Sequence, residues 1–145
     1  LIKSELEALI VNIKKILQYT NVRILINSSI DLAYEYELDG VNLNSKQLHE
    51  LRYFPKDLLV GASCHSENDL KVAEEKNADF AVLGSVKKTL THPDLEPMGW
   101  VRFNKLVNNS NLPIYSIGGM TNSDVLSSLE YGGIGIASQR AIWAK

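Results

Sequence analysis

Short apolar segments alternate with amphipathic segments along the whole chain. Six apolar segments rich in Val, Ile and Leu predict buried strands: residues 23–27, 40–43, 58–63, 78–84, 114–117 and 134–137. The amphipathic segments predict helices over residues 4–19, 30–38, 45–51, from 66 onward, 100–107 and 121–131, and the start of a last helix at 138–145. Strands that alternate with helices favour a parallel sheet with right-handed crossovers, so the predicted class is α/β.

Three of the predicted helices begin with Ser or Thr followed, three residues later, by an acidic residue. This spacing is typical of a capping box, in which two side chains satisfy free backbone amides. The pairs are Ser4 with Glu7, Ser66 with Asp69, and Thr121 with Asp124. Between the fourth strand and the 100–107 helix, residues 85–99 form a long polar segment with two prolines, which predicts a loop.

The 145 residues, 45% of them hydrophobic, suit a single domain with a real core. A net charge of -2 argues against a nucleic-acid partner. One cysteine cannot form an internal disulfide, no apolar run approaches the roughly 18 residues of a membrane span, and no signal peptide is evident. We therefore expect a cytoplasmic protein without membrane contact. Because the chain begins at Leu1, we also expect it to be processed or to be a piece of a longer protein.

Polar residues follow two neighbouring predicted strands, as on the active face of a (β/α) barrel. They are Ser63, Cys64 and His65 after the third strand, and Lys87, Lys88, Thr89, Thr91 and His92 after the fourth. The alternation alone fits either a barrel or a doubly wound open sheet. The absence of a G-x-G-x-x-G motif after the first strand argues against a dinucleotide-binding domain.

Each candidate site residue has two interpretations from its pattern. Gly118 and Gly119 after the fifth strand fit a phosphate cradle, or a tight turn with positive φ. Arg140 follows the sixth strand on the same rim and fits either a phosphate ligand or an exposed surface arginine. Ser63 and His65 share one side of their strand, whereas Cys64 points to the other side as a small hydrophobe, which disfavours a Cys-His nucleophilic pair.

Five motifs in order resemble the thiamine phosphate synthase and thiazole tautomerase superfamily, whose fold is a (β/α)8 barrel. They are RILIN (23–27), DGVNL (39–43), GASCHS (61–66), ADFAVLGSV (78–86) with Thr89 and Thr91, and PIYSIGGM (113–120). The sequence is most similar to the synthase-like carboxy-terminal domain of MutT-type Nudix fusion proteins, through motifs that include GW-x-RF (99–103) and Arg140 with Trp143.

The resemblance implies a role for each matching residue. His65 corresponds to the catalytic histidine of the tautomerase branch. Asn27, Ser63, Thr89 and Thr91 correspond to substrate-binding residues, and Gly118, Gly119 and Arg140 to phosphate-binding residues. The implied ligand is a small phosphorylated thiazole or thiamine-like molecule.

Two departures from the family pattern limit the prediction. The first strand, first helix and second strand of the barrel are absent, so only about six βα units are expected, and an upstream segment or a second copy of the chain would complete the barrel. The synthase reaction uses Mg²⁺ held by aspartates, but Ser28 and Gln47 stand at those positions. We therefore expect no metal or other cofactor unless the chain is a synthase.

Three functional hypotheses follow. The first is a thiamine-biosynthesis barrel domain that binds a phosphorylated thiazole or thiamine-like ligand and acts as a metal-independent thiazole tautomerase through His65. The second is a non-catalytic ligand-sensing or interaction module of a Nudix-linked protein. The third is thiamine phosphate synthase activity, which couples a pyrimidine diphosphate to a thiazole phosphate.

Overall fold

A computed structural model describes residues 2–89, 94 and 96–141 of the chain. Six strands form one sheet: β1 (Leu25–Asn27), β2 (Gly40–Leu43), β3 (Leu59–Cys64), β4 (Phe80–Leu83), β5 (Ile114–Ile117) and β6 (Gly135–Ala137). The helices are α1 (Lys3–Leu17), α2 (Ile30–Glu35), α3 (Ser45–Glu50), α4 (Glu67–Glu75), α5 (Gly99–Asn108) and α6 (Val125–Glu130), and the 3-10 turn η1 (Asn122–Asp124) precedes α6. None of the helices in this described part is long and apolar enough to cross a membrane.

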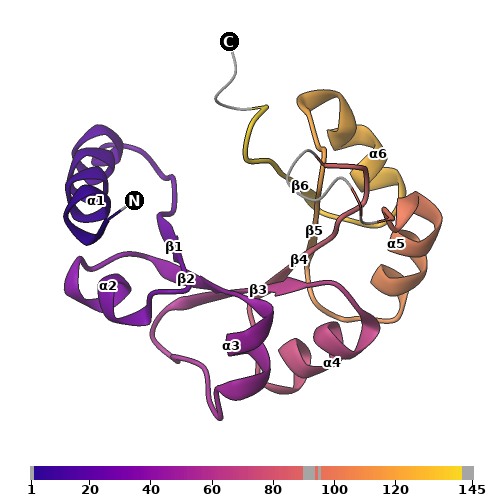
Figure 1. Cartoon of the computed structure of the whole chain (residues 1–145), viewed down its shortest axis with the longest axis horizontal. Helices are drawn as coiled ribbons and strands as arrows, with labels where there is room; N and C mark the ends of the chain where they lie inside the picture. Colours follow the sequence, from indigo (N-terminus) through magenta and orange to yellow (C-terminus); the bar gives the residue numbers. More distant parts are fainter. Residues whose placement is uncertain (1, 90–93, 95, 142–145) are drawn as a thin grey trace.

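Strand order decides between the two architectures that the alternation allows. The strands lie in chain order from β1 to β6, and each pairs in parallel with its neighbour. A doubly wound sheet would reverse direction at a switch point, whereas a barrel continues in one direction. The strands follow an arc with α2 to α6 on its outer side (Figure 1), so the fold is a curled half-barrel of TIM type. The prediction of a barrel-type fold is confirmed, with six parallel strands that alternate with helices.

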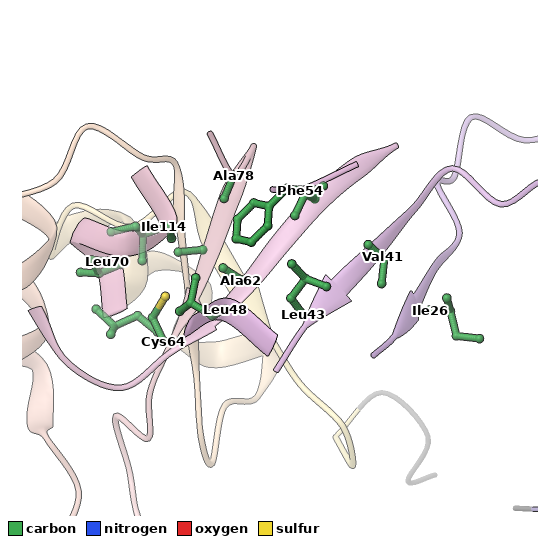
Figure 2. Close-up of a cluster of buried hydrophobic side chains, with 14 of the residues drawn as sticks. Ile26, Val41, Leu43, Leu48, Phe54, Ala62, Cys64, Leu70, Ala78 and Ile114 are labelled. Carbon is green, nitrogen blue, oxygen red and sulfur yellow. The ribbon is translucent and has the colours of Figure 1, made fainter. Parts of the chain in front are cut away.

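The core lies between the convex face of the sheet and the helices, as the buried side chains in Figure 2 show. Alternate strand residues supply it: Val41, Leu43, Ala62 and Cys64 are fully buried. The residues between them face the concave side, where a closed barrel would bury them. In this chain Ser63 and its neighbours on that face are only half-buried, so the concave face carries polar groups that a ligand could reach.

Two sequence-based expectations are wrong. α1 begins at Lys3 rather than after Ser4, and its first amides are met by Glu5, whose Oε2 accepts from the Ile2 amide at 3.0 Å. Glu7, predicted to pair with Ser4, instead contacts Lys3 at 3.5 Å, because the two lie one turn apart on the helix. The second error concerns the end of the chain: residues 138–141 form bends and a turn rather than the start of a helix.

Candidate functional site

A cavity of about 520 Å³ opens at the carboxyl ends of β3 to β6. It is lined by His65, Gly84, Ser85, Lys88, Thr89, Ile117, Gly118, Gly119, Met120, Thr121, Ala137, Ser138, Gln139, Arg140 and Ala141. The structure therefore brings together five predicted site residues: His65, Thr89, Gly118, Gly119 and Arg140. Thr91, the sixth from the same rim, lies outside the described residues, as do His92 and Trp143.

The two glycines after β5 form a loop in which neither position has room for a side chain. Gly118 has φ +100° and Gly119 has φ +65°. A Cβ atom on Gly118 would lie 2.2 Å from Ser85 Oγ, and one on Gly119 would lie 2.7 Å from the Lys88 carbonyl oxygen. The tight-turn interpretation is thus confirmed, because glycine is required both for the backbone angle and for packing against the loop after β4.

The same loop offers donors to an anion. Among the hydrogen bonds between described residues, none uses the backbone amides of Gly118, Gly119 or Met120 as donor. The loop is held in place from both sides: Lys87 N donates to Gly118 O at 3.1 Å, and Ser138 Oγ donates to Met120 O at 2.8 Å. Three consecutive amides without an acceptor among the described residues, on a fixed loop at the cavity wall, are suited to bind phosphate, so the cradle interpretation stays a prediction alongside the turn.

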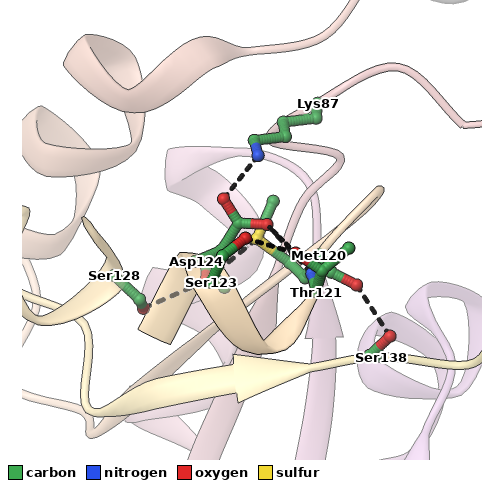
Figure 3. Close-up of polar contacts among 8 residues, drawn as sticks. Lys87, Met120, Thr121, Ser123, Asp124, Ser128 and Ser138 are labelled. Atoms are coloured by element: carbon green, nitrogen blue, oxygen red, sulfur yellow. Dashed lines mark hydrogen bonds and ion pairs between the residues drawn. The ribbon is translucent and has the colours of Figure 1, made fainter. Parts of the chain in front are cut away.

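Three cations surround this loop, in two different roles. Arg140 and Lys88 are exposed and line the cavity. Lys87 does not line it; its ammonium forms an ion pair with Asp124 at the end of η1 (Figure 3). Burial would raise the pKa of Asp124, but Lys87 and the amide and hydroxyl of Thr121 outweigh burial and hold that pKa below its usual value.

His65 is fixed at two points beside the cavity. Its Nδ1 lies 2.8 Å from the Gly84 carbonyl oxygen, and its backbone amide donates to Asp69 Oδ2 at 2.8 Å. Because a carbonyl oxygen only accepts, Nδ1 carries a proton, and Nε2 of the neutral ring holds the lone pair. The side chain can therefore accept a proton at Nε2 without losing the contact that orients it.

Asp69 supports His65 from behind. It is 6% exposed, and its Oδ1 lies 2.7 Å from His49 Nε2 on α3. Burial would raise the pKa of Asp69, but hydrogen bonds from His49 and from the His65 amide outweigh burial and keep that pKa below its usual value. The predicted cap is half right: Asp69 N donates to Ser66 Oγ at 3.1 Å, but the carboxylate serves His49 and His65.

Asn27 and Ser63 do not line this cavity. They form a separate polar row on the concave face with Asn42, whose Nδ2 donates to Ser63 Oγ at 2.9 Å and to Asn27 Oδ1 at 3.3 Å. Asn42 Oδ1 is buried and has no hydrogen-bond partner among the described residues. Because that oxygen is enclosed by the protein, the groups of this row that a ligand can contact are the exposed Asn27 and the half-buried Ser63.

The residues at the family's metal positions do not fit a magnesium ion. Ser28 Oγ accepts from Asn44 Nδ2 at 2.9 Å, and Ser28 O accepts from Gln47 Nε2 at 2.8 Å. Mg²⁺ prefers carboxylate oxygens, whereas these side chains are neutral and already hydrogen-bonded to other groups of the protein. Within the described residues, no group of three His, Cys, Asp or Glu side chains could hold a metal ion.

Cys64 is predicted to be unreactive in the folded protein. Its side chain is fully buried, and burial raises the pKa of the thiol to about 12, so little thiolate exists at pH 8. We expect iodoacetamide to label folded protein at least a hundredfold more slowly (an order-of-magnitude figure) than urea-unfolded protein. Mass spectrometry of timed samples measures this, and equal rates would contradict the burial.

Acid is predicted to weaken the fold through Asp69 and Asp124. Both folded-state pKa values lie below the unfolded value of about 3.9, so their stabilisation is present above that value and is lost as the pH falls below about 4. Urea unfolding at pH 7, 5, 4 and 3 measures the free energy of unfolding. We expect a decline below pH 4 that is smaller in an Asp69→Asn, Asp124→Asn double variant; equal declines would contradict the assignment.

Sequence reasoning missed several residues of the site. Ser85, Met120, Ser138 and Gln139 line the cavity; the first two lie in the quoted motifs 78–86 and 113–120, but nothing in the sequence singles out these four side chains as site residues. The place of Lys88 in the lining favours anion binding over simple solvation of its ammonium group. Asn42 could have been found from strand parity, since it pairs in register with Asn27 on the neighbouring strand.

Comparisons with known proteins agree on one family. A family model described as thiamine monophosphate synthase matches residues 1–142. The putative thiamine-phosphate synthase 2 of Aquifex aeolicus is 33% identical over 116 residues, 79% of this chain and 62% of that protein. The thiamine-phosphate synthase of Methanococcus vannielii is 30% identical over 132 residues, 90% of this chain and 64% of that protein. The chain thus spans about three-fifths of these relatives.

Solved structures support the fold. Thiamine phosphate pyrophosphorylase from Pyrococcus furiosus superposes with a TM-score of 0.76 at 24% identity, covering 93% of this chain and 66% of that one. FabK from Thermotoga maritima gives a TM-score of 0.60 at 17% identity, covering 90% of this chain and 45% of that one. At these identities the likeness concerns architecture alone. The similarity to Nudix-linked domains stays a prediction.

Proposed function

Because this chain belongs to the thiamine monophosphate synthase family, we propose that it binds a thiazole phosphate in the cavity at the carboxyl ends of β3 to β6. One observation carries the proposal: Arg140, Lys88 and the Gly118–Gly119 loop, whose amides donate to no acceptor among the described residues, meet at the wall of one cavity. A guanidinium grips phosphate oxygens through two parallel hydrogen bonds, and backbone amides add donors that cost no side-chain ordering.

The reaction proposed is that of a thiamine-phosphate synthase, in which a carbon–nitrogen bond joins the thiazole to a pyrimidine as diphosphate leaves. The names of the relatives favour this coupling over tautomerisation. The row Asn27, Asn42 and Ser63 would hold the pyrimidine, since Asn27 is exposed and Ser63 is half-buried, and their side-chain oxygens can accept from an amino group. Because Ser28 and Gln47 do not fit Mg²⁺, no step is assigned to a metal bound by this chain.

A second candidate, thiazole tautomerisation, is favoured by the geometry of His65. Its Nδ1 is held by Gly84 O while the ring lines the same cavity as the proposed phosphate site. A histidine in this state can take a proton from carbon at Nε2 and return it elsewhere on the ring. This chemistry needs no metal.

Calorimetric titration with thiazole phosphate tests the binding proposal. We expect saturable binding that weakens at least about thirtyfold in Arg140→Ala, which removes charge-assisted hydrogen bonds. Arg102→Ala is the matched control, because Arg102 is an exposed arginine on α5 that does not line the cavity. Absence of binding by the unmodified chain, or equal weakening in both variants, would contradict the site.

Turnover assays separate the two reactions. Formation of thiamine phosphate from pyrimidine diphosphate and thiazole phosphate supports coupling, and proton exchange on the thiazole alone supports tautomerisation. In either assay we expect His65→Gln to lower turnover by about a hundredfold or more while phosphate binding is kept. Unchanged turnover in that variant would remove His65 from the mechanism.

A further inference from the structure

A buried carboxylate lies directly behind the proposed phosphate loop. Asp124 is 5% exposed, and its Oδ2 accepts from the amide of Thr121 at 2.9 Å and from its hydroxyl at 3.0 Å. Thr121 is itself part of the cavity lining. The negative charge of Asp124 is therefore separated from the cavity by one residue.

This arrangement poses an electrostatic problem for any anion in the cavity. Two negative charges on opposite sides of a thin, poorly solvated wall repel each other, and burial of one of them limits screening by salt. The problem is removed if a cation neutralises the carboxylate. Among the described residues, the ion pair that Asp124 forms is with Lys87, whose side chain is 44% exposed and lies outside the lining.

The Lys87 backbone also joins the loop after β4 to the loop after β5. Its amide donates to Gly118 O at 3.1 Å, so the residue that neutralises Asp124 is fixed to the proposed phosphate loop itself. This hydrogen bond belongs to the main chain and is kept in any side-chain variant. The side chain can therefore be changed without releasing the loop.

We propose that Lys87 is a positioning residue that permits phosphate binding by neutralising Asp124, without touching the phosphate. The inference rests on the proposed phosphate site and adds a role that no motif assigns. It makes an unusual prediction: the lysine is needed only while the carboxylate is present.

Titration of the intact chain with inorganic phosphate at low ionic strength tests this with three variants. We expect Lys87→Met to bind about tenfold more weakly than the unmodified chain, because an uncompensated carboxylate remains behind the loop. We expect Asp124→Asn alone to bind within about twofold of the unmodified chain, and the double variant Lys87→Met, Asp124→Asn to recover to the same range. Circular dichroism of each variant verifies the fold.

The outcomes separate this inference from the proposed site. A double variant as weak as Lys87→Met would show that Lys87 contacts phosphate directly and would overturn the inference alone. Unchanged phosphate binding by Lys87→Met would also overturn the inference and leave the proposed site intact. If the unmodified chain does not bind phosphate, the proposed site fails and the inference fails with it. If Lys87→Met does not fold, the double variant still decides, since it retains no unpaired buried charge.

Discussion

Substitution of Gly118 by Ala is expected to lower the free energy of unfolding by about 3 kcal/mol. A left-handed backbone costs a non-glycine residue roughly 1–2 kcal/mol. The new Cβ would also lie 2.2 Å from Ser85 Oγ and 2.7 Å from Ser85 Cα, and overpacking of this kind costs roughly 1–3 kcal/mol. Because the Ser85 backbone cannot yield as a flexible side chain would, we expect the loop to move and the cavity to change shape.

Gly99→Ala provides the matched control for this prediction. Gly99 also has a positive φ, +69°, but a Cβ there would meet no atom of the described part of the chain within 4 Å. Substitution of Gly99 should lower the free energy of unfolding only by the cost of a left-handed backbone, about 1 kcal/mol. Urea unfolding of both variants measures the difference. Equal losses would mean that the close approach of Ser85 to Gly118 is relieved without cost.

The second large effect is expected from Asp69→Ala, which should lower the free energy of unfolding by about 2–4 kcal/mol. The change leaves the His65 amide without its acceptor at 2.8 Å and removes the partner of His49 at 2.7 Å. Both donors face a buried position, so water cannot easily replace the carboxylate. We also expect turnover to fall, because the His65 backbone is no longer held.

Two milder variants distinguish the parts of this network. Asp69→Asn keeps one oxygen for the His65 amide and presents its amide group to His49 Nε2, so we expect a loss of about 1 kcal/mol. His49→Ala removes only a partly exposed side chain, 39% accessible, and should cost less than about 1 kcal/mol. Thermal and urea unfolding measure these values. A larger loss in His49→Ala than in Asp69→Ala would contradict the central position of Asp69.

The sequence predicts a strand accurately where the residues next to it in the chain set its ends. β2 and β5 begin and end where the sequence predicts, because glycine, asparagine or proline borders each apolar run. β1 begins two residues later than predicted. Arg23 and the Ile24 amide contact the Asp39 carboxylate at 2.7 and 2.8 Å instead of continuing the strand, and a partner 15 or 16 residues away leaves no local trace.

The candidate site also combines features that the sequence predicts with features that it does not. The barrel rim, the glycine turn and the burial of Cys64 follow from strand parity and backbone sterics, so the sequence predicts them. The hydrogen bond between His49 and Asp69 and the ion pair between Lys87 and Asp124 join residues 20 and 37 positions apart. Such pairs depend on how loops and helices meet in space. Sequence reasoning named Asp69 and Asp124 as helix caps but could not show what else their carboxylates hold.

The strict neighbour-to-neighbour order of the sheet has a consequence for how the chain opens. β1 and β6 are three residues long, and each pairs on one side only within the described part of the chain, whereas β3 and β4 are paired on both sides. Local unfolding should therefore start at both ends of the arc and move inward. Amide protons of β3 and β4 would then exchange with deuterium last. The histidine side of the cavity, anchored to β3, would outlast the Arg140 side that follows β6.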